Sequence, residues 1–223
     1  MIKGVFFDWG FTLAHLAPER DVQFHQCAEE LGVVLPLKGL LKGVFEADNR
    51  VPEGAPPRYS KEKDKTPFLK WWEVLLSNIG GNLPENTKLE ITRLAGARAK
   101  KATWVLYDDV LPTLKMLKKQ GLIIGLISNI SMDRAGLERY LDFTVTAKDV
   151  GVGKPEMIIF STALKKAGLA ASEVIYIGDQ YEVDAVGARR AGMKAILIDR
   201  NNLASPVKDC TYISNLSDVI KLL

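Results

Sequence analysis

Four separated segments of the chain carry polar side chains that could do chemistry, most of them directly after an apolar run. They are Asp8 after residues 5–7, Ser128 after 123–127, Lys154 within 151–155, and Asp179 after 174–178. A carboxylate can attack an electrophilic centre and form a covalent intermediate, while a hydroxyl and an ammonium can neutralise the oxygens of an anion. This set of groups is typical of phosphoryl transfer to an aspartate.

The two acids suggest a metal ion. In a crevice with little water, Asp8 and Asp179 would repel one another unless a cation lay between them. Mg²⁺ prefers oxygen ligands and is commonly shared between one or two carboxylates and a substrate phosphate. We therefore expect Mg²⁺ as the cofactor, with Asp184 either supporting Asp179 or binding the metal itself.

The remaining polar groups are predicted to bind the phosphate. Ser128 and Asn129 stand where a strand gives way to an expected helix, so a hydroxyl and backbone N–H groups can face phosphate oxygens there. Lys154 adds a full positive charge, and Thr12 adds a hydroxyl close to Asp8. The predicted substrate is a small phosphorylated molecule.

The elements that must position these residues are short apolar runs separated by helical patterns. The runs are 5–7, 122–127, 143–146, 174–177 and 195–198. Their alternation with helices predicts an α/β fold with a parallel sheet, in which ligands bind outside the carboxyl ends of the strands. The polar residues above would then lie side by side at one edge of the sheet.

Residues 16–105 interrupt this alternation. They hold no clear strand and carry apolar residues at helical spacing, of which Trp71 and Trp72 are expected to be core. The segment 51–57 is rich in proline and predicts a loop between two helical halves. We expect an inserted helical domain at 16–105 and a core formed by 1–15 and 106–223.

Composition excludes several classes of protein. With 30 basic and 27 acidic residues in 223, the charge is too balanced to indicate a nucleic-acid partner. Cys27 and Cys210 form no metal or disulfide pattern, and no run approaches the roughly 20 apolar residues of a membrane span. We expect a cytoplasmic protein that binds neither nucleic acid nor membrane; the oligomeric state does not follow from the sequence.

Four motifs together resemble the haloacid dehalogenase superfamily of aspartate-nucleophile hydrolases. They are DWGFT at 8–12, LISN at 126–129, GKP at 153–155 and GDQYEVDAVGA at 178–188. The resemblance implies a Rossmann-like core with the first strand central and a helical cap inserted between the first and second motifs. It covers nearly all of the chain, although the cap itself carries no motif.

The resemblance also implies a role for each motif residue. It makes Asp8 the nucleophile and Ser128 and Lys154 the pair that stabilises the phosphate. The implied Mg²⁺ ligands are Asp8, the backbone carbonyl of Gly10, Asp179 and Asp184.

Three residues near the nucleophile bear on the rate. Phosphatases of the superfamily carry a second Asp where this chain has Gly10, and loss of that general acid and base costs typically 10² to 10⁴ in rate. Phe11 replaces a residue that is usually Gly in relatives. His15, a residue of the cap or the substrate itself could supply the missing proton transfer.

Three functional interpretations therefore stay open. The favoured one is a Mg²⁺-dependent phosphatase of a small metabolite, since binding a metal is the obvious use of Asp179 and Asp184. The second is a metal-independent 2-haloacid dehalogenase, which Gly10 permits. The third is a binding or regulatory protein that has lost catalysis. Activity of the purified protein with and without Mg²⁺ separates the three.

Overall fold

The computed structural model describes residues 1–51, 64–130, 136–203 and 209–223, which form two compact units. The first unit combines Met1–His15 with Trp104–Leu223, and the second comprises Leu16–Thr103. The chain therefore leaves the first unit after His15 and returns to it at Trp104.

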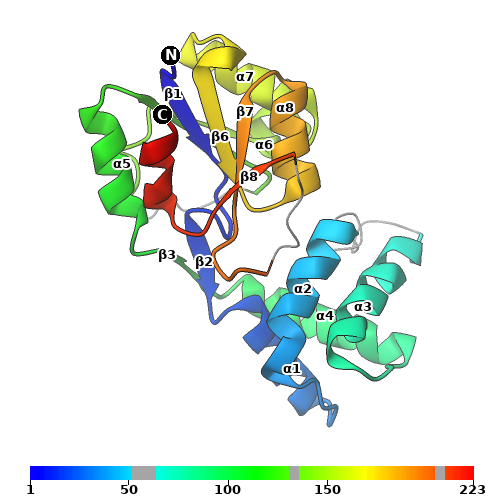
Figure 1. Cartoon of the computed structure of the whole chain (residues 1–223). Helices are drawn as coiled ribbons and strands as arrows, with labels where there is room; N and C mark the ends of the chain where they lie inside the picture. The colour runs from blue at the N-terminus through cyan, green and yellow to red at the C-terminus, as the bar shows by residue number, and fades with distance from the viewer. Residues whose placement is uncertain (52–63, 131–135, 204–208) are drawn as a thin grey trace. The chain divides into compact units, whose positions relative to one another are not determined.

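The first unit is built on a six-stranded parallel sheet (Figure 1). Its strands are β1 (Gly4–Phe7), β4 (Ile123–Ser128), β5 (Phe143–Thr146), β6 (Val174–Gly178), β7 (Lys194–Ile198) and β8 (Thr211–Ile213), in the order β5-β4-β1-β6-β7-β8. The α/β prediction is confirmed, and β1 lies inside the sheet between β4 and β6. β8 was not predicted, because its three residues are only partly buried and form no apolar run.

Helices cover both faces of this sheet. They are α5 (Val110–Lys119), α6 (Ala147–Val150), α7 (Met157–Ala167) and α8 (Gly187–Arg190), with the 3-10 helices η3 (Ala171–Glu173) and η5 (Leu216–Leu222) and the π-helix η4 (Tyr181–Val186). Val5 and Phe7 pack in one apolar cluster with α5 and η5, whereas Phe6 packs in another with α7 and α8. Because successive side chains of a strand point to opposite faces, all of β1 is buried.

The carboxyl ends of three adjacent strands meet at one edge. Phe7 pairs with Leu126 of β4 and with Ile177 of β6, so Asp8, Ser128 and Asp179 come at or just beyond the ends of neighbouring strands. The backbone N–H of Asp8 donates to the carbonyl of Ile177 at 2.8 Å, which continues the ladder by one step. Parallel pairing therefore brings together groups that are far apart in sequence.

The second unit consists mainly of helices, namely α1 (Arg20–Glu30), α2 (Leu37–Arg50), α3 (Thr66–Ile79) and α4 (Glu85–Ala99). Trp71 and Trp72 are fully buried in its core, as predicted. The indole N–H of Trp71 donates to Asp48 at 2.9 Å, and Asp48 also pairs with Arg20. The loop predicted at 51–57 lies, apart from its first residue, outside the described residues.

The expectation that 16–105 holds no strand is wrong at both ends. β2 (Ala14–Ala17) and β3 (Thr103–Leu106) form a two-stranded sheet. Each strand has only four residues, and a half-exposed strand that short gives too little alternation to be recognised in the sequence.

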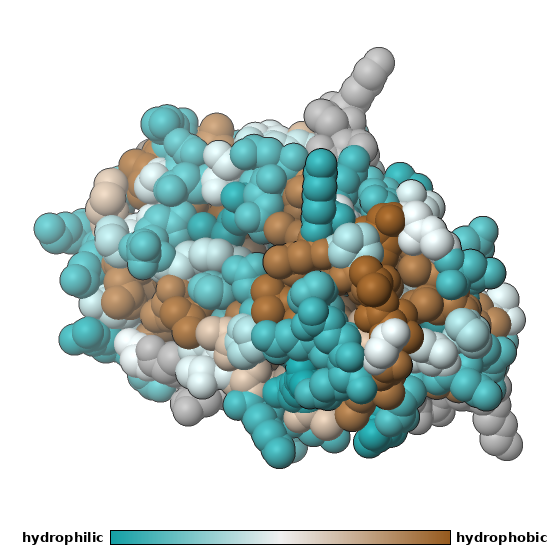
Figure 2. All heavy atoms as spheres, turned by 90° about the horizontal axis from the view of Figure 1, so that it is seen from below, coloured by the Kyte–Doolittle hydropathy of each residue, from teal (hydrophilic) through white to brown (hydrophobic). Residues whose placement is uncertain are grey.

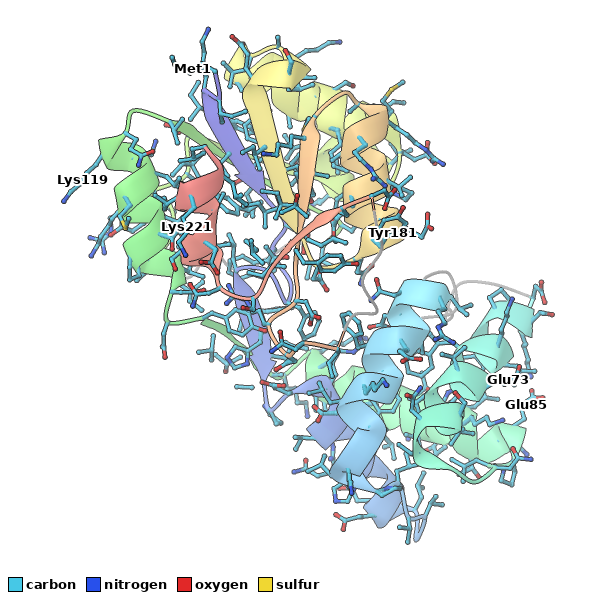
Figure 3. All side chains as sticks on the ribbon, viewed as in Figure 1. Met1, Glu73, Glu85, Lys119, Tyr181 and Lys221 are labelled. Carbon is cyan, nitrogen blue, oxygen red and sulfur yellow. The ribbon has the colours of Figure 1, made fainter. Side chains whose placement is uncertain are left out.

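The surface shows hydrophobic patches among hydrophilic residues on the face drawn in Figure 2. Exposed apolar side chains include Val34, Met157 and Ile158. Scattered exposure of this kind is normal for folded proteins. Charged side chains such as Lys119, at the end of α5, extend from the surface in Figure 3. In the described part of the chain, no helix is both long and apolar enough to cross a bilayer.

Candidate active site

Asp8 lies at the base of a tight turn that follows β1. Its side chain is buried, with 7% of the residue exposed. The carbonyl of the next residue, Trp9, accepts hydrogen bonds from the N–H groups of Leu13 and Ala14, at 2.9 and 3.1 Å. The turn thus closes directly after the candidate nucleophile and fixes where its carboxylate stands.

Lys154 joins the polar groups into one network. Its Nζ donates to Oδ1 of Asp8, to Oδ1 of Asp184 at 2.6 Å and to the hydroxyl of Tyr176 at 3.0 Å. Asp184 in turn accepts the Tyr176 hydroxyl at 2.8 Å on Oδ1 and the backbone N–H of Gln180 at 3.0 Å on Oδ2. The residue after β1, a residue inside β6 and a residue of η4 therefore meet at a single buried ammonium group.

Two motif glycines make room for this network. A Cβ added to Gly178 would lie 2.3 Å from Cγ of Asp184, and one added to Gly153 would lie 2.6 Å from Oδ1 of Asn129. Both distances are far inside van der Waals contact. The glycines in GKP and GDQYEVDAVGA are thus needed where a polar side chain crosses close to the backbone.

Asn129 holds the backbone of the lysine loop. Its Nδ2 donates to the carbonyl of Lys154 at 3.0 Å, and its Oδ1 accepts the backbone N–H of Lys154 at 2.6 Å. Both ends of the amide are used in this way, and the contact of Asn129 with substrate stays a prediction. The neighbouring Ser128 is buried, and its hydroxyl accepts the N–H of Ile130 at 3.2 Å. A helix following Asn129 would begin among residues outside the described ranges.

Thr12 was also predicted to bind substrate. The residue is fully buried, and its hydroxyl has no hydrogen-bond partner in the described part of the chain. Its carbonyl accepts two N–H groups of the Arg200 guanidinium, at 3.1 and 2.7 Å. The guanidinium also donates to Asp109 at 3.0 Å and lies 3.8 Å from the ring centre of Tyr107. Arg200 thus holds the backbone of the buried Thr12 in place.

Burial and nearby charges shift the pKa values of Asp8 and Asp179. Burial raises the pKa of Asp8 to about 6, because the positive charge of Lys154 only partly offsets the loss of solvation and Asp184 adds negative charge. Burial, followed by the charges of Asp184 and Asp8, raises the pKa of Asp179 well above its ordinary value. Asp8 and Asp179 therefore have too little positive charge nearby for both to ionise easily.

Burial and the same nearby charges also shift the pKa values of Lys154 and Tyr176. Burial lowers the pKa of Lys154, but the charges of Asp184 and Asp8 outweigh burial and raise it to about 12. Burial and the same two charges raise the pKa of Tyr176 well above its ordinary value, so the hydroxyl keeps its proton. The network thus contains a permanent ammonium and a permanent hydroxyl.

The acids fit a divalent cation. One carboxylate oxygen from each of Asp8, Asp179 and Asp184 lies within 4.8 Å of the others. Three carboxylates against the single Lys154 ammonium leave an excess of two negative charges when all are ionised. A hard cation with oxygen ligands would satisfy that excess, and Asp179, which is half-buried, leaves it a route to solvent.

A family model described as haloacid dehalogenase-like hydrolase matches residues 2–192. The chain belongs to this hydrolase family. Membership favours an enzyme over the binding-protein interpretation of the sequence.

Relatives of this haloacid dehalogenase-like hydrolase match most of its length. Haloacid dehalogenase-like hydrolase domain-containing protein 3 of Danio rerio is 30% identical over 211 residues, which cover 90% of this chain and 86% of the relative. Glyceraldehyde 3-phosphate phosphatase of Methanocaldococcus jannaschii is 32% identical over 211 residues, which cover 89% of this chain and 85% of the relative.

Among solved structures, the crystal structure of a 2-haloacid dehalogenase from Pseudomonas syringae pv. Tomato DC3000 is similar over the full length. It is 27% identical, has a TM-score of 0.60, and the match covers 100% of this chain and 98% of that chain. The relatives therefore include one named as a phosphatase and one named as a dehalogenase.

In this haloacid dehalogenase-like hydrolase, the turn after the candidate nucleophile Asp8 has two unusual positions. Phe11 has a φ of 57°, in the left-handed region that favours glycine. This backbone conformation agrees with the glycine that the family resemblance leads us to expect at this position. Gly10 lies against Trp104, whose ring would be 3.4 Å from an added Cβ. The ring of His15 stacks on that of Tyr107, with centroids 4.8 Å apart.

The sequence did not single out Tyr176 or Arg200. Tyr176 stands within the apolar run of β6 and was included there as part of a buried strand. The available signal was a hydroxyl-bearing side chain two residues before the strand end. Arg200 follows β7 with no motif around it, so nothing local indicated its contact with Thr12.

Proposed function

We propose that this hydrolase is a Mg²⁺-dependent phosphatase of small phosphorylated metabolites. The observation that carries the proposal is the cluster of Asp8, Asp179 and Asp184, whose carboxylates lie within 4.8 Å of one another beside a single lysine. Carbon–halogen cleavage by an aspartate needs no cation, whereas a phosphate brings further negative charge that must be neutralised. The phosphatase name of a relative 32% identical to the chain also supports this function.

The cation would be held by Asp8, Asp179, Asp184 and the backbone carbonyl of Gly10. When bound, Mg²⁺ would neutralise phosphate oxygens and the charge that develops on them. Asp179 is the most accessible of the three acids, whereas Asp184 is buried and its Oδ2 accepts the Gln180 N–H.

In the first half of the reaction, an ionised oxygen of Asp8 attacks phosphorus. The new bond between this oxygen and phosphorus forms as the bond between phosphorus and the ester oxygen breaks, and the leaving group takes the bonding electrons. Lys154 holds the attacking carboxylate by a direct hydrogen bond and provides positive charge next to the phosphoryl oxygens. Ser128, buried at the end of β4, would orient the phosphate with its hydroxyl.

In the second half, the oxygen of a water molecule attacks phosphorus and the bond to Asp8 breaks. Inorganic phosphate leaves, the carboxylate is restored, and the proton that the water loses passes to the solvent. Gly10 offers no side chain to transfer protons in either half. The enzyme should therefore be slow with alkyl phosphates and faster with phosphates whose leaving group is already acidic.

We also propose that the helical cap domain expected at 16–105 corresponds to the compact unit Leu16–Thr103 and selects the substrate. A substrate panel should include glyceraldehyde 3-phosphate, since a relative is named for it. Other small phosphorylated aldehydes and sugars would extend the panel.

A second candidate is a 2-haloacid dehalogenase. The full-length similarity to such an enzyme at 27% identity favours it, and Gly10 is compatible with it. In that reaction Asp8 would attack carbon and displace halide without a metal. Halide release from 2-chloropropionate in the presence of EDTA would select this function.

The test is hydrolysis of 4-nitrophenyl phosphate by the purified protein. We expect slow turnover that needs Mg²⁺, stops with EDTA, and is abolished in Asp8→Asn. Asp108→Asn is the matched control, because Asp108 is an exposed carboxylate of the same unit and should leave the rate unchanged. Turnover that persists without metal, or in Asp8→Asn, contradicts the proposed function.

A further inference from the structure

Tyr176 places a hydroxyl inside the charged network without any solvent contact. The residue lies on β6 and is fully buried, and its ring packs edge-on against Phe160, with centroids 5.2 Å apart and an interplanar angle of 82°. This packing sets the ring independently of the hydroxyl. The hydroxyl is then delivered to a fixed point, 3.0 Å from Nζ of Lys154 and 2.8 Å from Oδ1 of Asp184.

Elementary hydrogen-bond chemistry decides the direction of both contacts. A lysine ammonium has three donors and no acceptor, whereas an ionised carboxylate has only acceptors. The hydroxyl has one proton, so it must accept from Lys154 and donate to Asp184. The Tyr176 hydroxyl thus links Lys154 to Asp184, and the direction of each of the two hydrogen bonds is fixed.

The bridge completes the donor set of Lys154. Its three N–H groups are directed to Asp8, Asp184 and Tyr176, which is the full number that an ammonium can make. The tyrosine contact comes from β6, the strand that pairs with β1, so it limits rotation of Nζ about the end of its flexible stem. Without it, two carboxylates alone would define the position of a mobile group.

We propose that Tyr176 is a positioning residue for phosphoryl transfer: its hydroxyl holds Nζ of Lys154 against Asp8 and keeps Oδ1 of Asp184 directed at the lysine. The inference rests on the proposed phosphatase function. Since a misplacement of about 1 Å at a reacting group can cost about 10² in rate, removal of the hydroxyl should lower kcat by about 10- to 100-fold. KM for the substrate should change by less than about threefold, because the charge of Lys154 remains.

Tyr176→Phe tests the role with a single atom removed and the ring packing on Phe160 retained. The assay is Mg²⁺-dependent hydrolysis of 4-nitrophenyl phosphate, with kcat and KM measured separately and folding checked by circular dichroism. Tyr140→Phe is the matched control: Tyr140 is largely buried in the other apolar cluster, which contains no group of the network. Its kcat should stay within about twofold of the unmodified protein.

A double-mutant cycle shows whether the hydroxyl acts through the lysine. In Lys154→Met the addition of Tyr176→Phe should lower kcat by less than about twofold, since there is no ammonium left to position. Full multiplication of the two losses would overturn the proposal.

The remaining outcomes also decide the matter. A folded Tyr176→Phe with unchanged kcat overturns the positioning role while the phosphatase function stands. A Tyr176→Phe that does not fold also overturns it, because the hydroxyl would then serve folding. If the unmodified protein hydrolyses no phosphate ester with Mg²⁺, the proposed function fails first and the positioning role fails with it.

Discussion

The pH dependence of Mg²⁺ binding tests the charge balance of the site most directly. The perturbation is a change of pH from 7 to 5 in the unmodified protein. Burial raises the pKa of Asp8 to about 6, and a protonated carboxyl cannot ligate a metal. Affinity should therefore be highest above pH 6 and should fall as the pH drops through that value.

The magnitude follows from the fraction of Asp8 that is ionised. A carboxyl with a pKa of about 6 is ~90% ionised at pH 7 and ~9% ionised at pH 5, so affinity falls about tenfold, or about 1.4 kcal/mol, from Asp8 alone. Asp179, whose pKa is also raised, should add to this loss. A carboxyl with its ordinary pKa of 3.8 would be almost fully ionised at both pH values and would cause almost no change.

The assay is isothermal titration calorimetry with MgCl₂ at pH 5, 6 and 7, in two buffers of different ionisation enthalpy. The buffer difference should report nearly one proton released from Asp8 for each Mg²⁺ bound at pH 5, and far fewer at pH 7. Asp8→Asn should lose that released proton, and Asp108→Asn should keep it. An affinity that changes by less than about twofold between pH 5 and 7, without proton release, would refute the reasoning.

Three further substitutions test other parts of the structure. Gly10→Asp should raise kcat for an alkyl phosphate by about 10² or more and that for an aryl phosphate by less, because Trp104 leaves an added Cβ at 3.4 Å; equal gains in the two assays would reject a missing proton donor. Phe11→Gly should be about 1 kcal/mol more stable to urea than Phe11→Ala, since both lose the ring and only glycine accepts a φ of 57° without strain; the reverse order would contradict the strain. Arg200→Met should lower the free energy of unfolding by about 3 kcal/mol, because Asp109 would lose its ion pair in a largely buried position; a loss below about 1 kcal/mol in urea unfolding would show that the pair contributes little.

The fold was accessible from the sequence because its signals are local. Apolar runs that end at a polar residue, separated by helical patterns, predict a parallel sheet, and the observed sheet has the five expected strands near the expected bounds. β2, β3 and β8 escaped prediction because they are partly exposed and lack the fully buried apolar run of the similarly short β1. The burial of Trp71 and Trp72 followed from helical spacing in the same way.

The candidate site could be predicted only in part from the sequence. Strand ends located Asp8, Ser128 and Asp179 at one edge, since parallel strands align their carboxyl ends whatever the side chains do. The hydrogen-bond partners of each side chain could not be predicted from the neighbouring sequence. Asn129 hydrogen-bonds the backbone of Lys154, and the buried Thr12 accepts Arg200 on its carbonyl, whereas the sequence offered both only as substrate-binding residues, a role that stays a prediction.

The sequence by itself determined which chemical groups this hydrolase brings to one sheet edge: a carboxylate after the first strand, a lysine loop and a pair of acids after β6. Only the tertiary structure decided how they are joined. The contacts of Lys154 with Asp8, Tyr176 and Asp184 span 146, 22 and 30 residues of sequence. Such contacts depend on side-chain directions and on the close approaches at Gly153 and Gly178. Both are properties of the folded sheet and its loops, and neither can be read from a local stretch of sequence.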